Sequence, residues 1–406
     1  MCFVTVPHPL GMISKEEVNA KVDAAFDDIV KAATAWTPSK EKQDAQVKPY
    51  PAKRFKFSGT YADVNDMFQK RKWSLSLPIV PPTVDKVAAM LKGTKRNPAE
   101  VLWVVPPRQG MLTVELVAAC GVLAGAKPEH MPLLIATVEA MADPVAAWRG
   151  PTTTTAATVP VFFISGPIID KLKLNPGTGT AGGENPVTNA LGYFVNLVGD
   201  VVGGSVPPNF DKSTHGSSAD LVAMVFTENA KENPWKTTYA EEAGFKPGDS
   251  IVTHFSAYLG NANIDHDSKT GQRLLTTLST GLLGSASGLA SCLADYDATY
   301  AINNKVSFAF IVLCPEHAAT IAKDFPDQRA ARDFMRETAA MPYKFYSQET
   351  CVPGKDFGPY DENTFIPRFK KTESIKFFVS GGPGKQSQIW VPFPQVFKPV
   401  SKKIAE

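Results

Sequence analysis

The run Val306-Ser-Phe-Ala-Phe-Ile-Val-Leu-Cys314 is the stretch that decides the fold class. It is almost continuously apolar, which is typical of a strand buried on both faces. Pro315 follows at once and predicts the start of a helix. Because strands and helices alternate in this way along much of the chain, we predict an α/β fold with mixed, layered sheets and flanking helices.

The alternation is visible in both directions from this run. Further strands are predicted over 159–165, 221–226, 251–258 and 375–379. Helices are predicted over 60–72, 83–91, 113–141 in two pieces, 273–283 and from Pro186 onward. The sequence shows no internal repeat.

The first residues read as the end of an α/β unit. Cys2 to Val6 is apolar and β-prone, and Ser14 with Glu17 forms a capping box that starts an amphipathic helix. A lone strand would have unpaired edges, so we expect its partner strands to come from elsewhere in this chain or from another chain. Residues 1–36 are thus predicted to be the tail of a truncated α/β unit.

Composition bounds the remaining possibilities. The 406 residues predict two or three domains, here a linker over 37–54 and a large α/β domain over 55–406 with one or two subdomains. The net charge of +2 and the absence of a basic stripe argue against nucleic-acid binding. We see no signal peptide and no membrane-length apolar run. Five widely spaced cysteines fit a reducing, cytoplasmic location.

Several phrases, taken in order, resemble the long form of the UGSC-motif protein family. They are Val4-Thr-Val-Pro-His-Pro-Leu-Gly11, Leu77-Pro-Ile-Val-Pro-Pro-Thr83, Glu129-His-Met-Pro132, Ser165-Gly-Pro-Ile168, Asp211-Lys-Ser-Thr-His-Gly216, Glu228-Asn-Ala-Lys-Glu-Asn-Pro-Trp235 and Cys314-Pro-Glu-His-Ala318. The resemblance implies that residues 3–36 end an N-terminal domain and that a larger second domain follows. The family's Sec-or-Cys/Gly/Ser/Cys motif is absent from this chain, so it is a divergent member by this comparison.

Histidines are the first candidates for acid–base chemistry, because their pKa lies near neutrality. His215 and His266 lie in polar loops, and His317 lies in the first turn after the 306–314 strand. Strand ends are where α/β sheets usually place ligands. Each of the three also has an ordinary structural reading, as a solvated loop residue or a helix-turn residue.

Glu228 is the candidate carboxylate. It ends a predicted buried strand, where partial desolvation would raise its pKa. It would orient a histidine or take the second proton, unless it serves only as a structural hydrogen-bonding group. We predict that His317, His215, His266 and Glu228 meet in one cleft.

The loop Gly177-Thr-Gly-Thr-Ala-Gly-Gly183 is the candidate anion site. Its backbone N–H groups could converge, and the following helix would add the positive end of its dipole. The predicted substrate- or anion-binding residues are Gly177, Gly179, Gly182, Gly183 and Asn189. The alternative is an ordered surface loop.

No cofactor and no metal site are predicted. Asp265, His266 and Asp267 are adjacent, and adjacent side chains cannot usually all reach one ion. Cys120 lies inside an apolar helix and reads as an inert thiol. There is no Gly-x-Ser-x-Gly motif, no His-Glu-x-x-His motif and no paired Cys/His nucleophile signature.

Three readings of function remain open. The first is an enzyme, or the large subunit of a hetero-oligomeric enzyme, that uses histidine and carboxylate acid–base chemistry on a small organic molecule, in a lyase or carbon–heteroatom bond reaction. The second is a non-catalytic scaffold for a partner that carries the missing UGSC-like domain. The third, a thiol-redox protein, is the weakest because the redox motif is absent. The expected partners are a small-molecule substrate and a second subunit or another copy, without nucleic acid or membrane.

Overall fold

The computed structural model describes Val4, Val6, Pro7 and residues 13–35, 50–207, 214–258, 260–284, 308–345, 361–369, 371–393, 396 and 398–405. Contacts divide the chain into two compact units, Met1–Lys48 and Pro49–Glu406. The division falls inside the segment predicted to be a linker. Each unit is described by itself below.

The first unit contains helix α1 (Lys15–Thr34). Its predicted start is confirmed, since the backbone N–H of Glu17 donates to Ser14 Oγ and the Ser14 N–H donates to the Glu17 carboxylate. Phe26 is 56% exposed, and Val22, Ile29 and Val30 are also exposed. The helix therefore presents an apolar stripe to its surroundings. The strand predicted over 2–6 lies outside the described residues, apart from Val4 and Val6.

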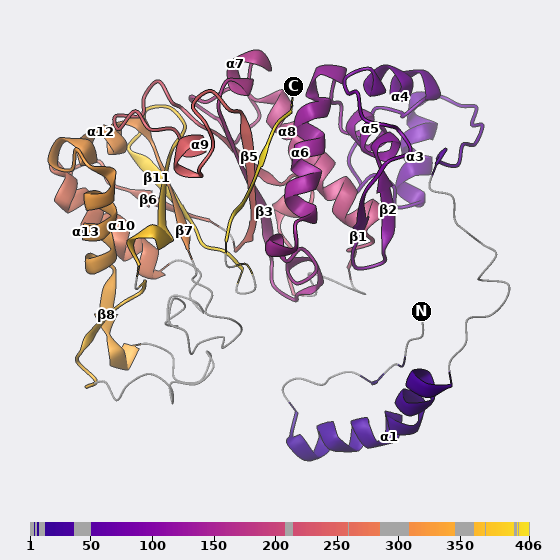
Figure 1. The fold of residues 1–406 in the computed structure, drawn as a ribbon, viewed down its shortest axis with the longest axis horizontal. Helices are drawn as coiled ribbons and strands as arrows, with labels where there is room; N and C mark the ends of the chain where they lie inside the picture. Colours follow the sequence, from indigo (N-terminus) through magenta and orange to yellow (C-terminus); the bar gives the residue numbers. More distant parts are fainter. Residues whose placement is uncertain are drawn as a thin grey trace. The chain divides into compact units, whose positions relative to one another are not determined.

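The second unit is built on two four-stranded sheets, and the predicted α/β class is confirmed (Figure 1). The first sheet has the order β12 (Val400–Lys403), β5 (Ile251–Ala257), β3 (Val159–Ser165), β4 (Met224–Thr227). The second has the order β10 (Ile375–Val379), β7 (Ala309–Leu313), β11 (Gln386–Trp390), β6 (Asn261–Ile264). Two short antiparallel pairs accompany them: β1 (Val101–Val105) with β2 (Gly110–Thr113), and β8 (Ala340–Pro342) with β9 (Phe365–Pro367).

The two large sheets pack face to face through aromatic side chains. Phe163 of β3 stacks on Phe310 of β7 with ring centroids 4.4 Å apart, and Phe255 and Phe378 join the same cluster. Side chains of a strand alternate between faces, so the neighbours of Phe163 on β3, Phe162 and Ile164, point the other way into a second core. Each sheet is thus buried on both faces, as the apolar run of β7 predicts.

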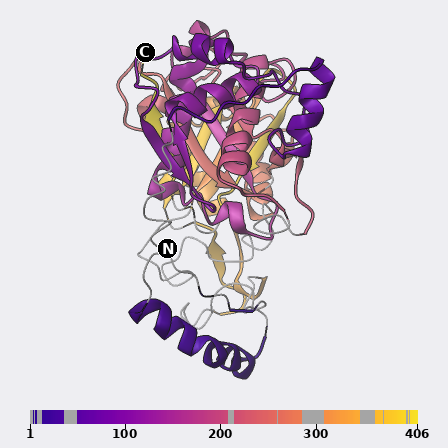
Figure 2. The ribbon, with the colours of Figure 1, turned by 90° about the vertical axis from the view of Figure 1, so that its right-hand side faces the viewer.

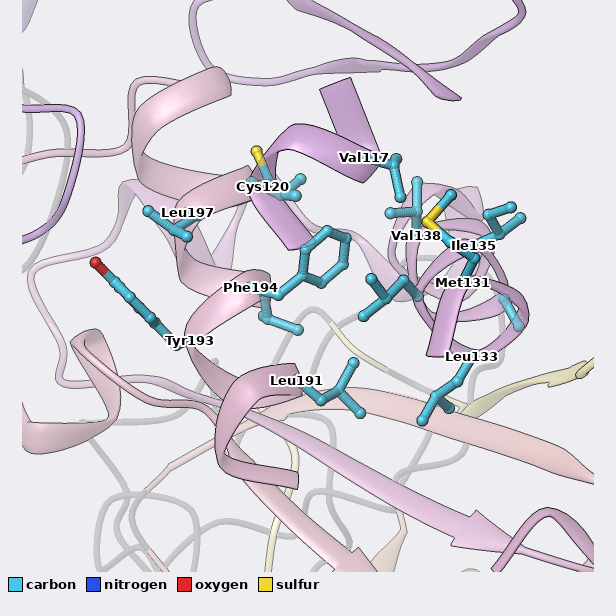
Figure 3. Close-up of a cluster of buried hydrophobic side chains, with 14 of the residues drawn as sticks. Val117, Cys120, Met131, Leu133, Ile135, Val138, Leu191, Tyr193, Phe194 and Leu197 are labelled. Atoms are coloured by element: carbon cyan, nitrogen blue, oxygen red, sulfur yellow. The ribbon is translucent and has the colours of Figure 1, made fainter. Parts of the chain in front are cut away.

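Helices cover the outer face of the first sheet. The second core joins it to α5 (Val114–Leu123), α6 (Met131–Ala142) and α8 (Pro186–Asn196). Figure 3 shows Val117, Val138 and Phe194 from these three helices meeting in that core. The smaller helices α3 (Tyr61–Lys70), α4 (Val84–Leu91) and α7 (Ile168–Lys171) lie on the same half of the chain. In Figure 2 this helical side faces the viewer.

The outer face of the second sheet is covered by α10 (Gly271–Gly284), α12 (Pro315–Asp324) and α13 (Gln328–Thr338). Leucines of α10 and Ile321 of α12 pack there against Ile311 and Phe377. The short helix α9 (Tyr239–Glu242) follows β4. The unit therefore has four layers in the order helices, sheet, sheet, helices, as Figure 1 shows from one side to the other.

The two sheets share one topology, although the sequence shows no repeat. In each, a strand (β3 or β7) is followed by helices and a parallel neighbour (β4 or β10), and then by an antiparallel neighbour on its other side (β5 or β11). The fourth strands are exchanged. β6 follows β5 in the chain but pairs with β11, and β12 follows β11 but pairs with β5. The expectation of no repeat thus holds for the sequence but not for the topology.

The strand registers show which single residues of the two sheets are equivalent. Ile164 of β3 pairs with Thr227, and Leu313 of β7 pairs with Val379. The residues after these pairs, Glu228 and Ser380, form an isolated bridge to one another. The two halves therefore meet at the carboxyl ends of their parallel strands, and Ser165 and Cys314 occupy equivalent positions there.

Candidate functional site

The best-defined polar cluster lies where β7 ends and α12 begins. Cys314 is the N-cap of α12, with Pro315 at its first position and His317 one turn further on. Cys314 is 5% exposed and His317 is 2% exposed. Because β7 is packed on both faces, it holds the thiol and the imidazole in fixed positions at its end.

Both ring nitrogens of His317 have partners. Its Nδ1 lies 2.8 Å from Ser387 Oγ, and its Nε2 lies 3.1 Å from the carbonyl oxygen of Asp265. A carbonyl oxygen can only accept, so Nε2 carries a proton in this arrangement. Nδ1 is therefore the nitrogen that can gain or lose a proton.

The Cys314 thiol and the His317 imidazole shift each other's pKa. Burial raises the pKa of Cys314, but hydrogen bonds from the His317 side chain and backbone and the charge of that imidazole outweigh burial and lower it below 9.0. Burial in turn lowers the pKa of His317, but the bond to Cys314 and its charge outweigh burial and raise it above 6.5. Both directions favour a thiolate beside an imidazolium.

Cys120 shows what burial does without such a partner. It lies in α5 at 5% exposure, and burial alone raises its pKa to about 12. The prediction that Cys120 is an unreactive thiol agrees with this shift. The two cysteines have the same exposed fraction, but only Cys314 has an imidazole and backbone N–H groups beside it that favour the thiolate.

Glu228 lies in a different polar cluster. Ser165 Oγ donates to its Oε2, and the backbone N–H of Tyr239 donates to its Oε1 at 2.7 Å. Burial raises the pKa of Glu228, as predicted, and the two hydrogen bonds only partly offset it. Its described contacts do not include His317. Ser387 and Asp265, rather than Glu228, orient that histidine.

The other two predicted histidines are both exposed. His266 follows Asp265, whose carbonyl contacts His317, and its own carbonyl accepts from Lys385 Nζ at 2.9 Å. It therefore lies beside the Cys314–His317 cluster. The Asp265 carboxylate is occupied by Ser268 and Thr277.

His215 lies elsewhere. Its neighbour Thr214 donates to the carbonyl of Thr155, which precedes β3. The segment that contains Thr214 and His215 leads into the start of β4. Because β3 and β4 are parallel, this is the opposite end of the sheet from Glu228. The prediction that all four residues share one cleft is wrong for His215, since its loop enters at the amino ends of the strands. Asp211, Lys212 and Ser213 lie outside the described residues.

Backbone and side-chain amides of the glycine-rich loop donate hydrogen bonds to acceptors in and beside the same loop. The N–H of Gly177 donates to Asn175 Oδ1, the N–H of Gly182 donates to the carbonyl of Gly179, and Asn189 Nδ2 donates to the carbonyl of Gly182. These bonds give the loop a structural order that needs no anion, and anion binding at Gly177, Gly179, Gly182, Gly183 and Asn189 stays a prediction.

The same loop packs against the second glycine-rich turn of the chain. The N–H of Gly381 donates to the carbonyl of Pro176 at 2.8 Å. A Cβ on Gly382 would lie 2.2 Å from Thr178 Oγ1, so only glycine fits there. The two stretches therefore lock together where the two halves of the unit meet.

Sequence reasoning missed Cys314 and Ser387 as members of the cluster. The spacing Cys-Pro-x-His across a strand-to-helix junction is a signal for Cys314, since it places thiol and imidazole one turn apart at a helix start. Ser387 has no local signal. It reaches His317 only because β11 pairs beside β7.

Comparison with protein-family models, curated proteins and solved structures finds no match. Within the described ranges, no group of three or more histidine, cysteine, aspartate or glutamate side chains is placed to hold a metal ion. None of the helices described is long and apolar enough to cross a membrane.

Proposed function

We propose that this chain is an enzyme, or the large subunit of one, that acts on a small organic molecule through Cys314 and His317. The observation that supports it is the placement of two buried groups at the end of β7, where Cys314 caps the helix that carries His317 and both ring nitrogens of His317 are held by hydrogen bonds. The directions of the two pKa shifts, toward thiolate and imidazolium, agree with it. The proposal retains His317 as the proton carrier and replaces Glu228 with Cys314 as its partner. We also propose that this chain is a divergent relative of the UGSC-motif family.

The reaction class that fits is cleavage of a carbon–heteroatom bond. The Cys314 thiolate would form a bond to the electrophilic carbon, while His317 gives a proton from Nδ1 to the departing heteroatom. Water would then attack the same carbon, return its proton to His317 and release the thiolate. No step in this sequence needs an oxidant or reductant.

Alkylation by iodoacetamide tests the pair. Because the pKa of Cys314 is lowered, the rate of its alkylation should rise with pH through a midpoint below 9.0, and Cys314 should be labelled before Cys120. In His317→Gln the midpoint should move upward. Peptide mapping by mass spectrometry identifies the labelled cysteine. Equal labelling of Cys314 in wild type and His317→Gln at every pH contradicts the proposal.

The second candidate is the scaffold, and the exposed stripe of α1 favours it. The face is continuous and apolar, and the described residues of the same compact unit leave it exposed; it is formed by Val22, Phe26, Ile29 and Val30. We propose a second subunit or another copy of this chain as the partner of α1. Removal of residues 1–36 should then abolish assembly, measured as particle mass by light scattering. A Phe26→Ser, Val30→Ser variant should do the same, and an unchanged mass in both rules the assembly out.

A further inference from the structure

A cavity of about 660 Å³ opens at the other end of the sheets from Cys314. Thr153 and Thr154, which precede β3, and Phe393, which follows β11, line it. Because β11 is antiparallel to β7, the end of β11 lies beside the start of β7, whereas Cys314 follows the last residue of β7. The cavity is therefore separate from the proposed catalytic pair. Its volume lies in the range of small-molecule sites.

Two tryptophans form its apolar wall. Trp148 is 4% exposed, and its ring contacts Trp103 edge to face with centroids 5.8 Å apart. Trp148 also packs on the His254 ring at 5.6 Å, and a Cβ on Gly199 would lie 3.0 Å from it. These contacts fix the Trp148 ring before any ligand arrives. A fixed aromatic wall suits a flat ring, which can stack or pack edge to face on it.

The charge balance of the cavity is positive. Of its two charged lining residues, Asp143 is neutralised, because Lys402 Nζ lies 2.7 Å from its Oδ2 and the Val145 N–H donates to its Oδ1. Arg149 is exposed and has no ion-pair partner among the residues described. Its guanidinium is thus available to an anion, and its fork geometry matches a carboxylate.

The backbone at the rim of the cavity is strained at Ala147. Ala147, which precedes Trp148, has a φ of 49°, a conformation that alanine rarely adopts. The short turns on either side of it, Pro144–Ala146 and Pro151–Thr153, set the positions of Trp148 and Arg149. Such strain persists only where the surrounding structure enforces it, and it gathers at ligand sites.

We propose that this cavity binds a small organic acid with a flat aromatic ring, the ring against Trp103 and Trp148 and the carboxylate on Arg149. The site goes beyond the proposed catalytic function and does not depend on it.

Calorimetric titration with indole-3-acetate tests the proposal. Wild type should bind it, and Arg149→Gln should weaken binding about tenfold or more, the usual value of a charged hydrogen bond. Neutral indole-3-acetamide should bind wild type and Arg149→Gln alike. Trp103→Leu should weaken the binding of both indole-3-acetate and indole-3-acetamide. Arg273→Gln, an exposed arginine of α10, is the matched control and should bind as wild type does.

The outcomes separate this site from the Cys314 pair. Cys314→Ser should leave binding of indole-3-acetate unchanged, whatever it does to alkylation. The proposal is overturned if wild type fails to bind indole-3-acetate, if cationic tryptamine binds as tightly, or if neither Arg149→Gln nor Trp103→Leu changes the affinity.

Discussion

His317→Asn should lower the turnover of an ester probe such as p-nitrophenyl acetate by about 10²–10⁴-fold, the usual value of a positioned proton carrier. Asparagine keeps a polar side chain but cannot carry the proton that Nδ1 exchanges, so the thiol of Cys314 returns toward its neutral form. Release of p-nitrophenol measures the rate. Thermal melting shows whether the variant is folded.

Two further variants make this prediction specific. Cys314→Ser should lose at least as much activity as His317→Asn, since the nucleophile itself is removed. His215→Asn is the matched control, because His215 is exposed and lies at the opposite end of β3 and β4. Near-normal turnover in both His317→Asn and Cys314→Ser contradicts the catalytic assignment. Equal losses in all three variants contradict it as well.

The parts of the fold that could be predicted are those whose signal is local. β3 and β10 have the predicted bounds because each is a short apolar run closed by a turn. The capping box at Ser14 marks a helix start that the structure confirms, and the helix predicted from Thr60 has Thr60 as its N-cap. A fully buried strand and a capped helix start can both be recognised from the types of a few consecutive residues.

The strands that could not be predicted depend on distant partners. β11 reads Gln386-Ser-Gln-Ile-Trp390, which is too polar to suggest a strand, yet it lies between β7 and β6. β6 and β12 are short edge strands that each complete the sheet of the other half. Their place follows from the exchange between halves, which no local pattern shows.

The candidate site divides in the same way. His317 could be predicted, because a histidine after a buried strand and a proline is a local feature. Its orienting partners Ser387 and Asp265 lie about 70 and 52 positions away in the chain and meet it only through sheet pairing. The prediction for His215 was wrong because a local feature was misleading without the strand order. Its polar loop looks like a strand-end loop, but the order of strands places it at the amino ends.

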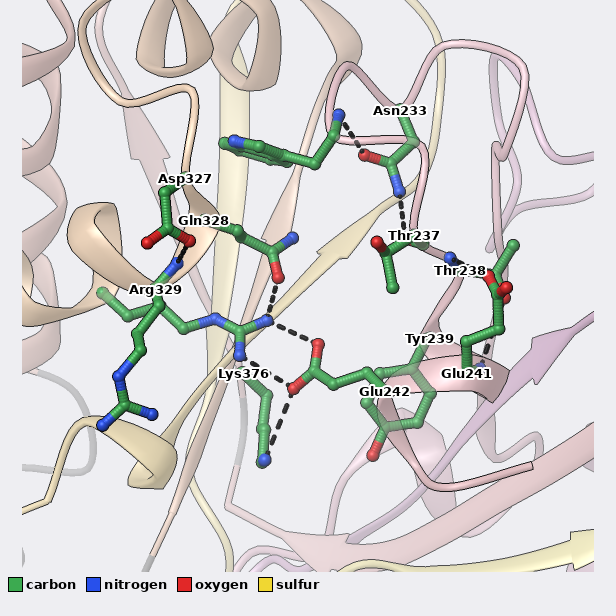
Figure 4. Close-up of polar contacts among 12 residues, drawn as sticks. Asn233, Thr237, Thr238, Tyr239, Glu241, Glu242, Asp327, Gln328, Arg329 and Lys376 are labelled. Carbon is green, nitrogen blue, oxygen red and sulfur yellow. Dashed lines mark hydrogen bonds and ion pairs between the residues drawn. The ribbon is translucent and has the colours of Figure 1, made fainter. Parts of the chain in front are cut away.

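Glu242→Gln should cost about 3–5 kcal/mol of unfolding free energy, the usual cost of breaking a buried ion pair by removing one partner. Figure 4 shows the reason, a bridge between α9 of one half and α13 and β10 of the other. Arg332 donates to both carboxylate oxygens of Glu242, at 2.9 and 2.5 Å, and Lys376 Nζ lies 3.4 Å from Oε1. The Arg332 side chain is only 10% exposed and the Glu242 side chain 17%.

The cost arises because two cations would remain without their anion. Among the described residues, Arg332 would keep only Gln328 as a side-chain partner and its contact over the Phe377 ring. Its Nε has no hydrogen-bond partner there even in wild type. A buried charge without its counterion is expensive, whereas an exposed pair contributes little. Glu373→Gln is therefore the matched control, since the Arg329–Glu373 pair is 64% and 58% exposed. It should unfold at nearly the wild-type urea concentration.

Urea unfolding followed by tryptophan fluorescence measures both variants. The double variant Glu242→Gln, Arg332→Gln should recover part of the loss, because it removes one stranded cation together with the anion. Equal unfolding midpoints for Glu242→Gln and Glu373→Gln would show that the bridge contributes no more than a surface pair. A large loss with recovery in the double variant would establish that the two halves, which share a topology and exchange strands, are also held together by charge between α9 and α13.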